Sequence, residues 1–344
     1  MPFDDHLRPD TSALYTDLYQ LTMLQAYWAE GMDEPAVFDL FVRRLKDRNY
    51  LLACGLEQAL EYLESLSFSE EALDYLDRQD RFDDAFLDWL AGFEFTGDVY
   101  AVPEGTPVFA DEPIVEVVAP IGEAQLVETF LLNQITFQTT VASKASRVVE
   151  AAQMADGDRL VADFGMRRLH GTDAAMKGAR AAYIAGVDAT SNVAAGQAYD
   201  LPITGTMAHS YVEAHDSERA ALRAFAELYP ETILLVDTYD TLDGVRKVID
   251  LATEPSLDIE VGGIRLDSGD LGDLAQQSRR LLDEAGLQDV KIIASGGLDE
   301  YKIADLLERG APIDGFGVGT KMGTSADQPA LDSAYKLSGY AGEP

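Results

Sequence analysis

The 344-residue chain is predicted to fold as an α/β protein, with a β/α barrel that follows a smaller N-terminal α+β domain. After about residue 159, short apolar runs alternate with helical patterns, as in a parallel sheet buried on both faces. Polar and glycine-rich residues follow each run, where parallel-sheet enzymes build their sites. We place the α+β domain at 1–115 and the barrel at 116–322, with the tail, 323–344, packing on the first domain.

The N-terminal part is predicted to mix helices and short strands, from apolar spacing and Pro/Gly turns. In order, the expected elements are a helix over 15–30, a strand over 37–42, helices within 56–92, strands within 97–109 and 113–118, and a long helix over 122–152.

The barrel part is predicted from five apolar runs with helices between them. The expected strands lie at 160–162, 233–236, 264–266, 291–294 and 313–318, and the helices lie at 172–185 and from about 241, 271 and 299.

The charge balance is extreme, with 26 Lys and Arg against 61 Asp and Glu and a net charge of −35. A field of this sign repels phosphates, so we expect no nucleic-acid partner and no binding to anionic membranes. Two interpretations remain open: adaptation to a salt-rich cytoplasm, as in a halophilic archaeon, or simply a very soluble acidic protein. We favour the first. The hydrophobic fraction of 47% is large enough to fill a core.

Cys54 is the only cysteine, which excludes internal disulfides and cysteine-rich metal sites, and we expect no structural metal. No apolar run approaches the roughly 20 residues that span a bilayer. The acidic segment Met1–His6 does not resemble a signal peptide, so we expect a cytoplasmic protein.

The first strand of the barrel part ends in Asp163–His170, a segment with two adjacent arginines. A guanidinium matches carboxylate or phosphate, and Phe164 offers a flat face to an aromatic ring. The alternative is that an arginine pairs with surface acids and Phe164 belongs to the core. We favour binding, for Arg167 more than for Arg168. Asp-Phe-Gly also occurs in protein kinases, but the other kinase motifs are missing.

A second cluster combines Thr190-Ser191-Asn192 with His209, which follows a predicted strand over Pro202–Thr206. An imidazole at a strand end can act as a general base or accept a phosphoryl group. A purely structural histidine is the alternative.

The segment Arg265–Leu271 joins a strand to a helix N-terminus, which suits a phosphorylated sugar. Asp267 can take ribose hydroxyls or Mg²⁺, beside Ser268 and Gly269. Ser268 or Asp270 can also serve as the helix N-cap, and both roles are compatible.

Glycines follow the last two strands, Gly296 and Gly297 after one and Gly319 before Thr320 and Lys321 after the other. Backbone amides at such glycines can approach an anion, as in the recurrent phosphate site of β/α barrels. Neither segment has the spacing of a dinucleotide fold or a P-loop.

A basic cluster in the first domain, Arg43, Arg44, Lys46 and Arg48, indicates either a local anion partner or a salt-bridged edge. These two interpretations are nearly equal.

Taken together, the motifs resemble nicotinate phosphoribosyltransferase, a type II phosphoribosyltransferase with an irregular TIM-like barrel, and they occur in that family's order over nearly the whole chain. The matching segments are Tyr15–Met23, Phe38–Arg44, Asp163–Arg168, Thr190–Asn192, Thr206–Ser210, Arg265–Leu271, Ser295–Gly297 and Gly315–Lys321. The resemblance implies an ATP-coupled, ligase-type transfer of phosphoribose from phosphoribosyl pyrophosphate to nicotinate in NAD biosynthesis, with Mg²⁺ bound to the donor and to ATP. It also implies a homodimer with active sites at the subunit interface.

The resemblance assigns a role to each candidate residue. His209 is expected to be phosphorylated by ATP, and Phe164 to stack on the pyridine ring opposite the partner subunit's Tyr19. Ser191 stands where nicotinamide-using relatives carry an acid, which favours nicotinate. The remaining assignments are Arg167 near the ring carboxylate or the phosphates, Thr190 beside Ser191, Arg265, Asp267, Ser268 and Gly269 on ribose and phosphates, Gly296, Gly297, Gly319 and Thr320 on the 5′-phosphate, and Arg43 and Arg44, with Lys46 as a further candidate, on the neighbouring subunit's pyrophosphate.

Two departures and two alternatives remain. Many relatives continue beyond the position of Pro344, and Ala208 stands where nicotinamide-using enzymes have Glu, so ATP turnover is expected to differ from theirs. Quinolinate phosphoribosyltransferase shares the architecture but would need more basic residues and no phosphorylated histidine. A catalytically silent relative is disfavoured by the intact glycines, His209 and Arg265.

Overall fold

The computed structural model describes residues 13–154, 157–257 and 259–344, so the predicted absence of a signal peptide at Met1–His6 lies outside the described residues. The chain divides into two compact units. Unit 1 comprises Met1–Ser143 and Ala330–Pro344, and unit 2 comprises Lys144–Pro329. Each unit has a hydrophobic core of its own.

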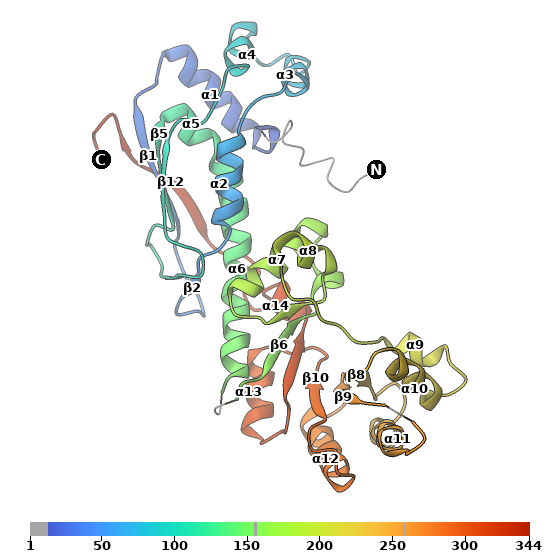
Figure 1. Ribbon diagram of the computed structural model, residues 1–344. Helices are drawn as coiled ribbons and strands as arrows, with labels where there is room; N and C mark the ends of the chain where they lie inside the picture. The colour runs from blue at the N-terminus through green and yellow to red at the C-terminus, as the bar shows by residue number, and fades with distance from the viewer. Residues whose placement is uncertain (1–12, 155–156, 258) are drawn as a thin grey trace. The chain divides into compact units, whose positions relative to one another are not determined.

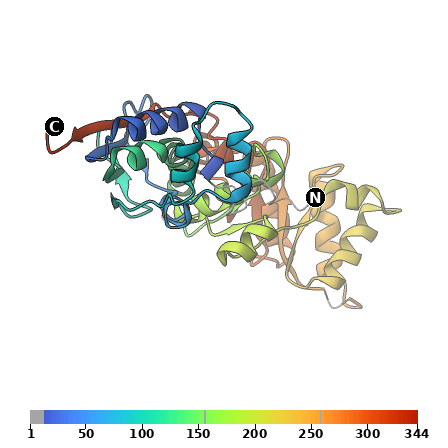
Figure 2. The ribbon, with the colours of Figure 1, turned by 90° about the horizontal axis from the view of Figure 1, so that it is seen from above.

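Unit 1 is an α+β domain built around a four-stranded sheet with the order β12-β1-β5-β3. Its elements are α1 (Leu18–Glu30), β1 (Pro35–Val42), β2 (Leu51–Leu52), α2 (Leu56–Ser65), α3 (Glu70–Asp77), α4 (Asp84–Leu90), β3 (Asp98–Ala101), β4 (Pro107–Val108), β5 (Val115–Pro120), α5 (Ile121–Leu126) and β12 (Ser333–Tyr340). Strands β2 and β4 form a separate small sheet. Helices α1 and α5 pack side by side, as the blue and green helices show in Figures 1 and 2.

The C-terminal strand β12 completes this sheet, as predicted. It pairs antiparallel with β1 (Figure 1), so that Leu40 lies opposite Tyr335. The ring centroids of Phe38 and Tyr335 are 4.8 Å apart, in a stacked arrangement. Alternate residues of β1 are buried, which is the period expected of a strand with one face on the core. Strand β12 is therefore held both by backbone hydrogen bonds to β1 and by burial of Tyr335 in the core of unit 1.

The boundary between the units falls within a continuous helix. Helix α6 (Glu128–Ala152) contributes Leu131 and Ile135 to the core of unit 1 and Ala145 and Val148 to the core of unit 2. The division at Ser143 and Lys144 differs from the predicted boundary at 115/116, and the second division, after Pro329, differs from 322/323. The physical reason for the first difference is that one uninterrupted helix serves two cores, so no turn residue marks the change.

Unit 2 contains a six-stranded parallel sheet with the order β7-β6-β11-β10-β9-β8. Its strands are β6 (Leu160–Asp163), β7 (Ala189–Thr190), β8 (Thr232–Leu235), β9 (Val261–Leu266), β10 (Lys291–Ala294) and β11 (Gly315–Val318). Its helices are α7 (Thr172–Ile184), α8 (Val193–Tyr199), α9 (His209–Glu213), α10 (Glu218–Leu228), α11 (Thr241–Thr253), α12 (Leu271–Glu284), α13 (Glu300–Glu308) and α14 (Thr320–Gly323), with a 3₁₀ turn at Met166–Arg168. The α/β class is confirmed, and the sheet forms a parallel half-barrel. In the part of the chain that the structure describes, β7 and β8 are the two edge strands of this sheet.

The predicted strand over Pro202–Thr206 is wrong: this segment makes only a single bridge, between Thr190 and Ile203. A proline and a glycine within five residues leave too little chain for a ladder.

The carboxyl ends of four strands, β7, β8, β9 and β10, share one structural device. A polar residue after the strand accepts a hydrogen bond from a backbone N–H of the first turn of the next helix, and so fixes where each helix starts. The residues are Asn192 for α8, Asp240 for α11, Asp270 for α12 and Asp299 for α13. These caps also fix the loops that carry the predicted site residues.

Within residues 13–154, 157–257 and 259–344, no helix has the length and apolarity needed to cross a membrane.

Candidate active site

One side of the site is organised by Asp163, the last residue of β6. This carboxylate is buried; Oδ1 accepts a hydrogen bond from the Gly165 amide and Oδ2 accepts one from Thr190 Oγ1, both at 2.8 Å. Burial raises the pKa of Asp163, and the hydrogen bonds from Gly165 and Thr190 partly oppose this shift. Asp163 therefore joins the loop that holds Phe164 to the loop that holds Ser191.

Thr190, predicted to bind substrate, has its hydroxyl committed within the protein. Besides donating to Asp163, Oγ1 accepts a hydrogen bond from the amide of Asn192 at 3.1 Å. Thr190 is buried, whereas Ser191 is half-buried. Of the two neighbouring hydroxyls, that of Ser191 is the more accessible to a ligand.

Phe164 lies against the backbone of β11. Its amide donates to the carbonyl of Val318 at 2.8 Å, and a Cβ added at Gly317 would lie only 2.3 Å from the ring. A glycine at position 317 is thus what makes room for the aromatic side chain. The half-buried ring remains partly available for stacking.

Arg265 and its neighbours form the cationic part of the site. The Arg265 guanidinium donates to Thr206 Oγ1, and its Nε has no hydrogen-bond partner among the described residues. Burial lowers the pKa of Arg265; Asp267 and Asp237 oppose this shift, while the positive charge of Arg167 adds to it. Arginine nevertheless stays charged, so an anion bound near both guanidinium groups would relieve their repulsion.

Asp237 was missed by the sequence reasoning, although it directly follows the predicted strand over 233–236. It is buried at the end of β8, and Oδ2 accepts hydrogen bonds from the amide of Asp267 at 2.9 Å and from Ser268 Oγ at 2.6 Å. Its Oδ1 has no hydrogen-bond partner within the described part of the chain. The rule that polar residues at strand ends build sites would have found it.

The loops after β9 and β10 are in direct contact. Ser295 Oγ donates to Asp267 Oδ1, and Gly296, at a φ of +92°, lies so close that an added Cβ would be 2.0 Å from the Asp267 carbonyl oxygen. Only glycine fits this approach. Gly297 follows, also with a positive φ of +64°. The predicted ribose loop and the first glycine-rich loop are thus adjacent.

His209 begins the short helix α9, and its Nδ1 is 3.1 Å from Thr238 Oγ1. Thr238 directly follows Asp237 after β8. The imidazole of His209 is therefore oriented by the same loop that carries Asp237. Its ring is half-buried.

The second glycine-rich loop lies beside Phe164, because a Cβ at Gly319 would be 3.0 Å from the Phe164 carbonyl oxygen. Thr320 is exposed at the start of α14. Lys321 Nζ is paired with Asp299 Oδ2 at 2.5 Å, so its charge is already balanced within the protein.

Tyr19, Arg43 and Arg44 belong to unit 1. Tyr19 is largely exposed on α1. The partial burial of its side chain, followed by the charges of Glu128 and Asp17, raises the pKa of its hydroxyl. Arg43 forms an exposed ion pair with Asp332 at 2.9 Å, which corresponds to the salt-bridged edge, and Arg44 is exposed.

The other basic residues differ in exposure. Arg48 is buried in unit 1 and donates to the Thr140 carbonyl, so it is not an exposed contact for an anion. Arg167 and Arg168 are exposed in the 3₁₀ turn after β6.

Among the residues that the structure describes, no group of three or more His, Cys, Asp or Glu side chains is arranged to hold a metal ion.

Two models of one protein family match most of the chain. Residues 14–136 match the nicotinate phosphoribosyltransferase (NAPRTase) N-terminal domain, and residues 160–340 match the nicotinate phosphoribosyltransferase (NAPRTase) family. The chain belongs to the nicotinate phosphoribosyltransferase family. A member of that family from Mycobacterium tuberculosis, nicotinate phosphoribosyltransferase pncB2, is 56% identical over 337 residues, which are 98% of this chain and 72% of the relative. Nicotinate phosphoribosyltransferase from Bacillus subtilis is 47% identical over 96% of this chain and 67% of its own length.

The fold of this nicotinate phosphoribosyltransferase family member also matches a solved structure. The crystal structure of human nicotinic acid phosphoribosyltransferase superposes with a TM-score of 0.83 at 28% identity, covering 96% of this chain and 75% of the human chain. The α/β class and the two-domain organisation are therefore those of the family.

Proposed function

We propose that the protein transfers phosphoribose from phosphoribosyl pyrophosphate to nicotinate, giving nicotinate mononucleotide and pyrophosphate. The observation that carries the proposal is the strand-end cluster of Arg265, Asp237, Asp267 and Ser295, in a chain 56% identical to a relative named for this activity. The relatives support the reaction class, and the cluster supplies the groups that such a reaction requires.

The chemistry asks for charge stabilisation and alignment. The bond from ribose C1 to the pyrophosphate oxygen breaks, the electron pair leaves with pyrophosphate, and the pyridine nitrogen forms the new bond to C1. The transition state resembles an oxocarbenium ion, so cations on the leaving group and a pre-aligned nitrogen lower the barrier. Arg265 and Arg167 supply the cations, and the nitrogen needs no general base.

The ring site is proposed on Phe164 and Ser191, which Asp163 holds in place. Phe164 stacks on the pyridine ring. Ser191 presents a hydroxyl rather than a carboxylate, so it does not repel the carboxylate of nicotinate.

The donor site is proposed on the loops after β9, β10 and β11. Asp267, Ser268 and Gly269 hold the ribose, and Gly296, Gly297, Gly319 and Thr320 surround the 5′-phosphate with backbone amides.

Mg²⁺ is proposed to enter as a complex with the donor's pyrophosphate. Mg²⁺ is commonly held by one or two carboxylates together with substrate phosphates. Asp237, whose Oδ1 lacks a partner within the described ranges, and the neighbouring Asp267 fit that donor set.

ATP coupling is proposed to act through His209. With Nδ1 held by Thr238, the other ring nitrogen, Nε2, is the one available to accept the γ-phosphoryl group, while ADP leaves. The phosphohistidine then strengthens donor binding, and its later hydrolysis releases phosphate.

A homodimer is proposed to complete each site, with the partner subunit's Tyr19 on the free face of the ring and the partner subunit's Arg44 near the pyrophosphate. The exposure of both side chains is consistent with such roles.

The net charge of −35 supports a further proposal, that the surface is adapted to high salt. The halophilic archaeal source stays a prediction, because the two relatives described above are bacterial.

The deciding experiment is an assay of the purified protein with nicotinate, phosphoribosyl pyrophosphate and Mg²⁺, with and without ATP. Nicotinate mononucleotide, separated by chromatography, is the expected product, in larger amount with ATP. Formation of the same product from quinolinate with release of CO₂, or no product from either acid, would overturn the proposal.

A further inference from the structure

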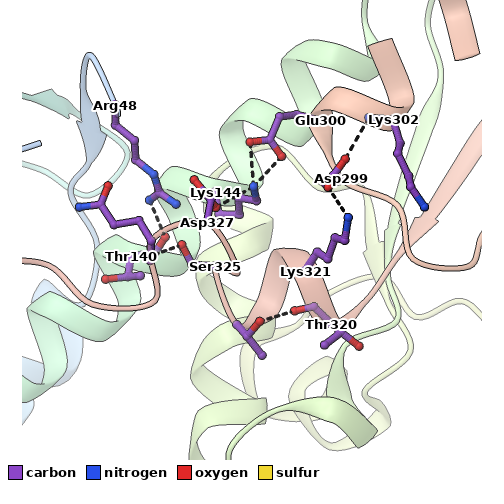
Figure 3. Close-up of polar contacts among 12 residues, drawn as sticks. Arg48, Thr140, Lys144, Asp299, Glu300, Lys302, Thr320, Lys321, Ser325 and Asp327 are labelled. Atoms are coloured by element: carbon purple, nitrogen blue, oxygen red, sulfur yellow. Dashed lines mark hydrogen bonds and ion pairs between the residues drawn. The ribbon is translucent and has the colours of Figure 1, made fainter. Parts of the chain in front are cut away.

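A buried lysine of α6 connects two segments that follow the glycine-rich loops. The Lys144 side chain is 2% exposed, and its Nζ lies 2.7 Å from Glu300 Oε2 and 2.7 Å from Asp327 Oδ1 (Figure 3). Glu300 is the first residue of α13, and Asp327 follows α14. All three side chains belong to unit 2.

Stability alone gives little reason for such a cluster. The side chain of Glu300 is 10% exposed and that of Asp327 is 31% exposed, so the ammonium and the Glu300 carboxylate are largely withdrawn from water. This withdrawal is costly, and well-packed apolar side chains of similar volume often give equal or greater stability. A buried ion cluster does, however, impose a defined geometry on the elements that it joins. The elements joined here are the ones that carry the proposed phosphate loops.

A second ion pair reinforces the first. Asp299 accepts a hydrogen bond from the Lys302 amide at 2.9 Å through Oδ1, and its Oδ2 lies 2.5 Å from Lys321 Nζ (Figure 3). Burial raises the pKa of Asp299, but the hydrogen bonds from Lys321 and the Lys302 amide, with the charges of Lys321 and Lys144, outweigh burial and lower it overall. Asp299 thus stays ionised and holds α14 to the start of α13.

The two links act on neighbouring loops. Ser295–Gly297 lies one residue before the Asp299 cap of α13, and Gly319 immediately precedes α14. Their strands, β10 and β11, are adjacent and parallel. Lys144 fixes the start of α13 to the segment after α14, and Asp299 fixes the same helix start to Lys321. The segments that follow the two loops are therefore linked by ion pairs, besides the pairing of β10 with β11.

We propose that Lys144 is a positioning residue for the 5′-phosphate of the ribose donor. Acting through Glu300 and Asp327, it fixes the distance between the Ser295–Gly297 loop and the Gly319–Thr320 loop, so that backbone amides of both reach one phosphate. Lys144 itself is too deeply buried to contact the ligand. This inference rests on the proposed function, since the phosphate belongs to the donor of that reaction.

The test compares Lys144→Met and Glu300→Gln with the unmodified protein. Binding of ribose 5-phosphate and of nicotinate is measured by calorimetry, and KM and kcat are measured for both substrates. We expect ribose 5-phosphate affinity to fall and the donor KM to rise by at least about tenfold, because small displacements of positioning groups have large effects. Nicotinate affinity, and kcat at saturating donor, should change little.

Glu300→Gln keeps the side-chain volume and one acceptor for Lys144, so it tests the inference even if Lys144→Met does not fold. Arg279→Met is the matched control. Arg279 pairs with Asp283 and donates to the carbonyls of Leu287 and Val290, in the connection that enters β10 at the opposite end from the loops. This variant should lose stability without a selective change in donor binding.

Three outcomes are decisive. A selective loss of ribose 5-phosphate binding in Glu300→Gln but not in Arg279→Met supports the positioning role. Unchanged donor binding in folded Lys144→Met and Glu300→Gln, or equal losses for both substrates, overturns it. Absence of product and of ribose 5-phosphate binding in the unmodified protein would instead overturn the proposed function.

Discussion

Thr190 Oγ1 donates a hydrogen bond of 2.8 Å to Asp163 Oδ2, and this contact ties the end of β7 to the end of β6. The other oxygen of Asp163 accepts from Gly165, directly after Phe164, and Ser191 directly follows Thr190. One buried carboxylate therefore sets the spacing between an aromatic face and a hydroxyl, the two groups proposed to recognise the pyridine ring and its carboxylate.

Asp163→Asn should damage nicotinate recognition more than donor recognition. The amide nitrogen of Asn cannot accept the hydrogen bond that one carboxylate oxygen accepts, and an unsatisfied buried donor costs about 1–3 kcal/mol. We expect a lower melting temperature and a raised KM for nicotinate. Thr190→Ser, which keeps the hydroxyl, is the control. An unchanged nicotinate KM in folded Asp163→Asn would contradict the proposed role of Asp163 in spacing Phe164 and Ser191.

Gly317→Ala should displace the Phe164 ring, because the added Cβ would lie 2.3 Å from it. The ring cannot remain in place at that distance, so the stacking face moves. We expect the KM for nicotinate to rise by about tenfold or more, since misplaced contacts cost that much. Gly92→Ala is the control, because its added methyl group would be 3.8 Å from the nearest neighbour. Equal behaviour of the two variants would argue against the Phe164 role.

Much of the fold could be predicted from local pattern. The apolar run at 291–294 coincides with β10, and that at 313–318 contains β11, because strands buried on both faces carry continuous apolar side chains. The domain boundary could not be predicted, since α6 carries apolar residues for two different cores. An unbroken helix gives no local signal of such a change.

The site was predictable where it depends on strand ends and unpredictable where it depends on distant partners. Arg265, Asp267 and Ser295 meet as parallel-sheet topology requires. Lys144 is different, because its partner Glu300 is 156 positions away along the chain and an isolated lysine in a helix reads as surface. Only the ion pairs of Lys144 with Glu300 and Asp327 show why that lysine is buried.

Ser191 should make the enzyme prefer nicotinate over nicotinamide. A neutral hydroxyl does not repel the carboxylate of nicotinate. Ser191→Asp would place a negative charge beside that carboxylate and so shift the preference toward nicotinamide. The measurement is kcat/KM for each ring substrate, in the unmodified protein and in the variant, with Ser191→Ala as the uncharged control. Comparable kcat/KM for nicotinate and nicotinamide in the unmodified protein would contradict the role of Ser191 in this preference.

His209→Ala should abolish stimulation by ATP while leaving slow formation of nicotinate mononucleotide. The imidazole is proposed to carry the phosphoryl group, and glycosyl transfer itself does not require it. Thr238→Val, which removes the hydrogen bond to Nδ1, should weaken the stimulation without abolishing it. Rates with and without ATP, and transfer of label from γ-³²P-ATP to the protein, measure both effects. Full ATP coupling in His209→Ala would refute the phosphohistidine.

The melting temperature should rise between low and molar KCl. With 61 Asp and Glu against 26 Lys and Arg, repulsion among carboxylates opposes the compact state at low ionic strength. Salt removes this repulsion, because the Debye length falls to about 3 Å at 1 M. Screening predicts a steep rise at low concentration that levels off once this length is shorter than the spacing of surface charges. Sucrose at matched osmolality is the control, since it stabilises by exclusion from the surface and does not screen charge. A melting temperature that is flat in KCl, or that rises equally in sucrose, would show that the charge is not a salt adaptation.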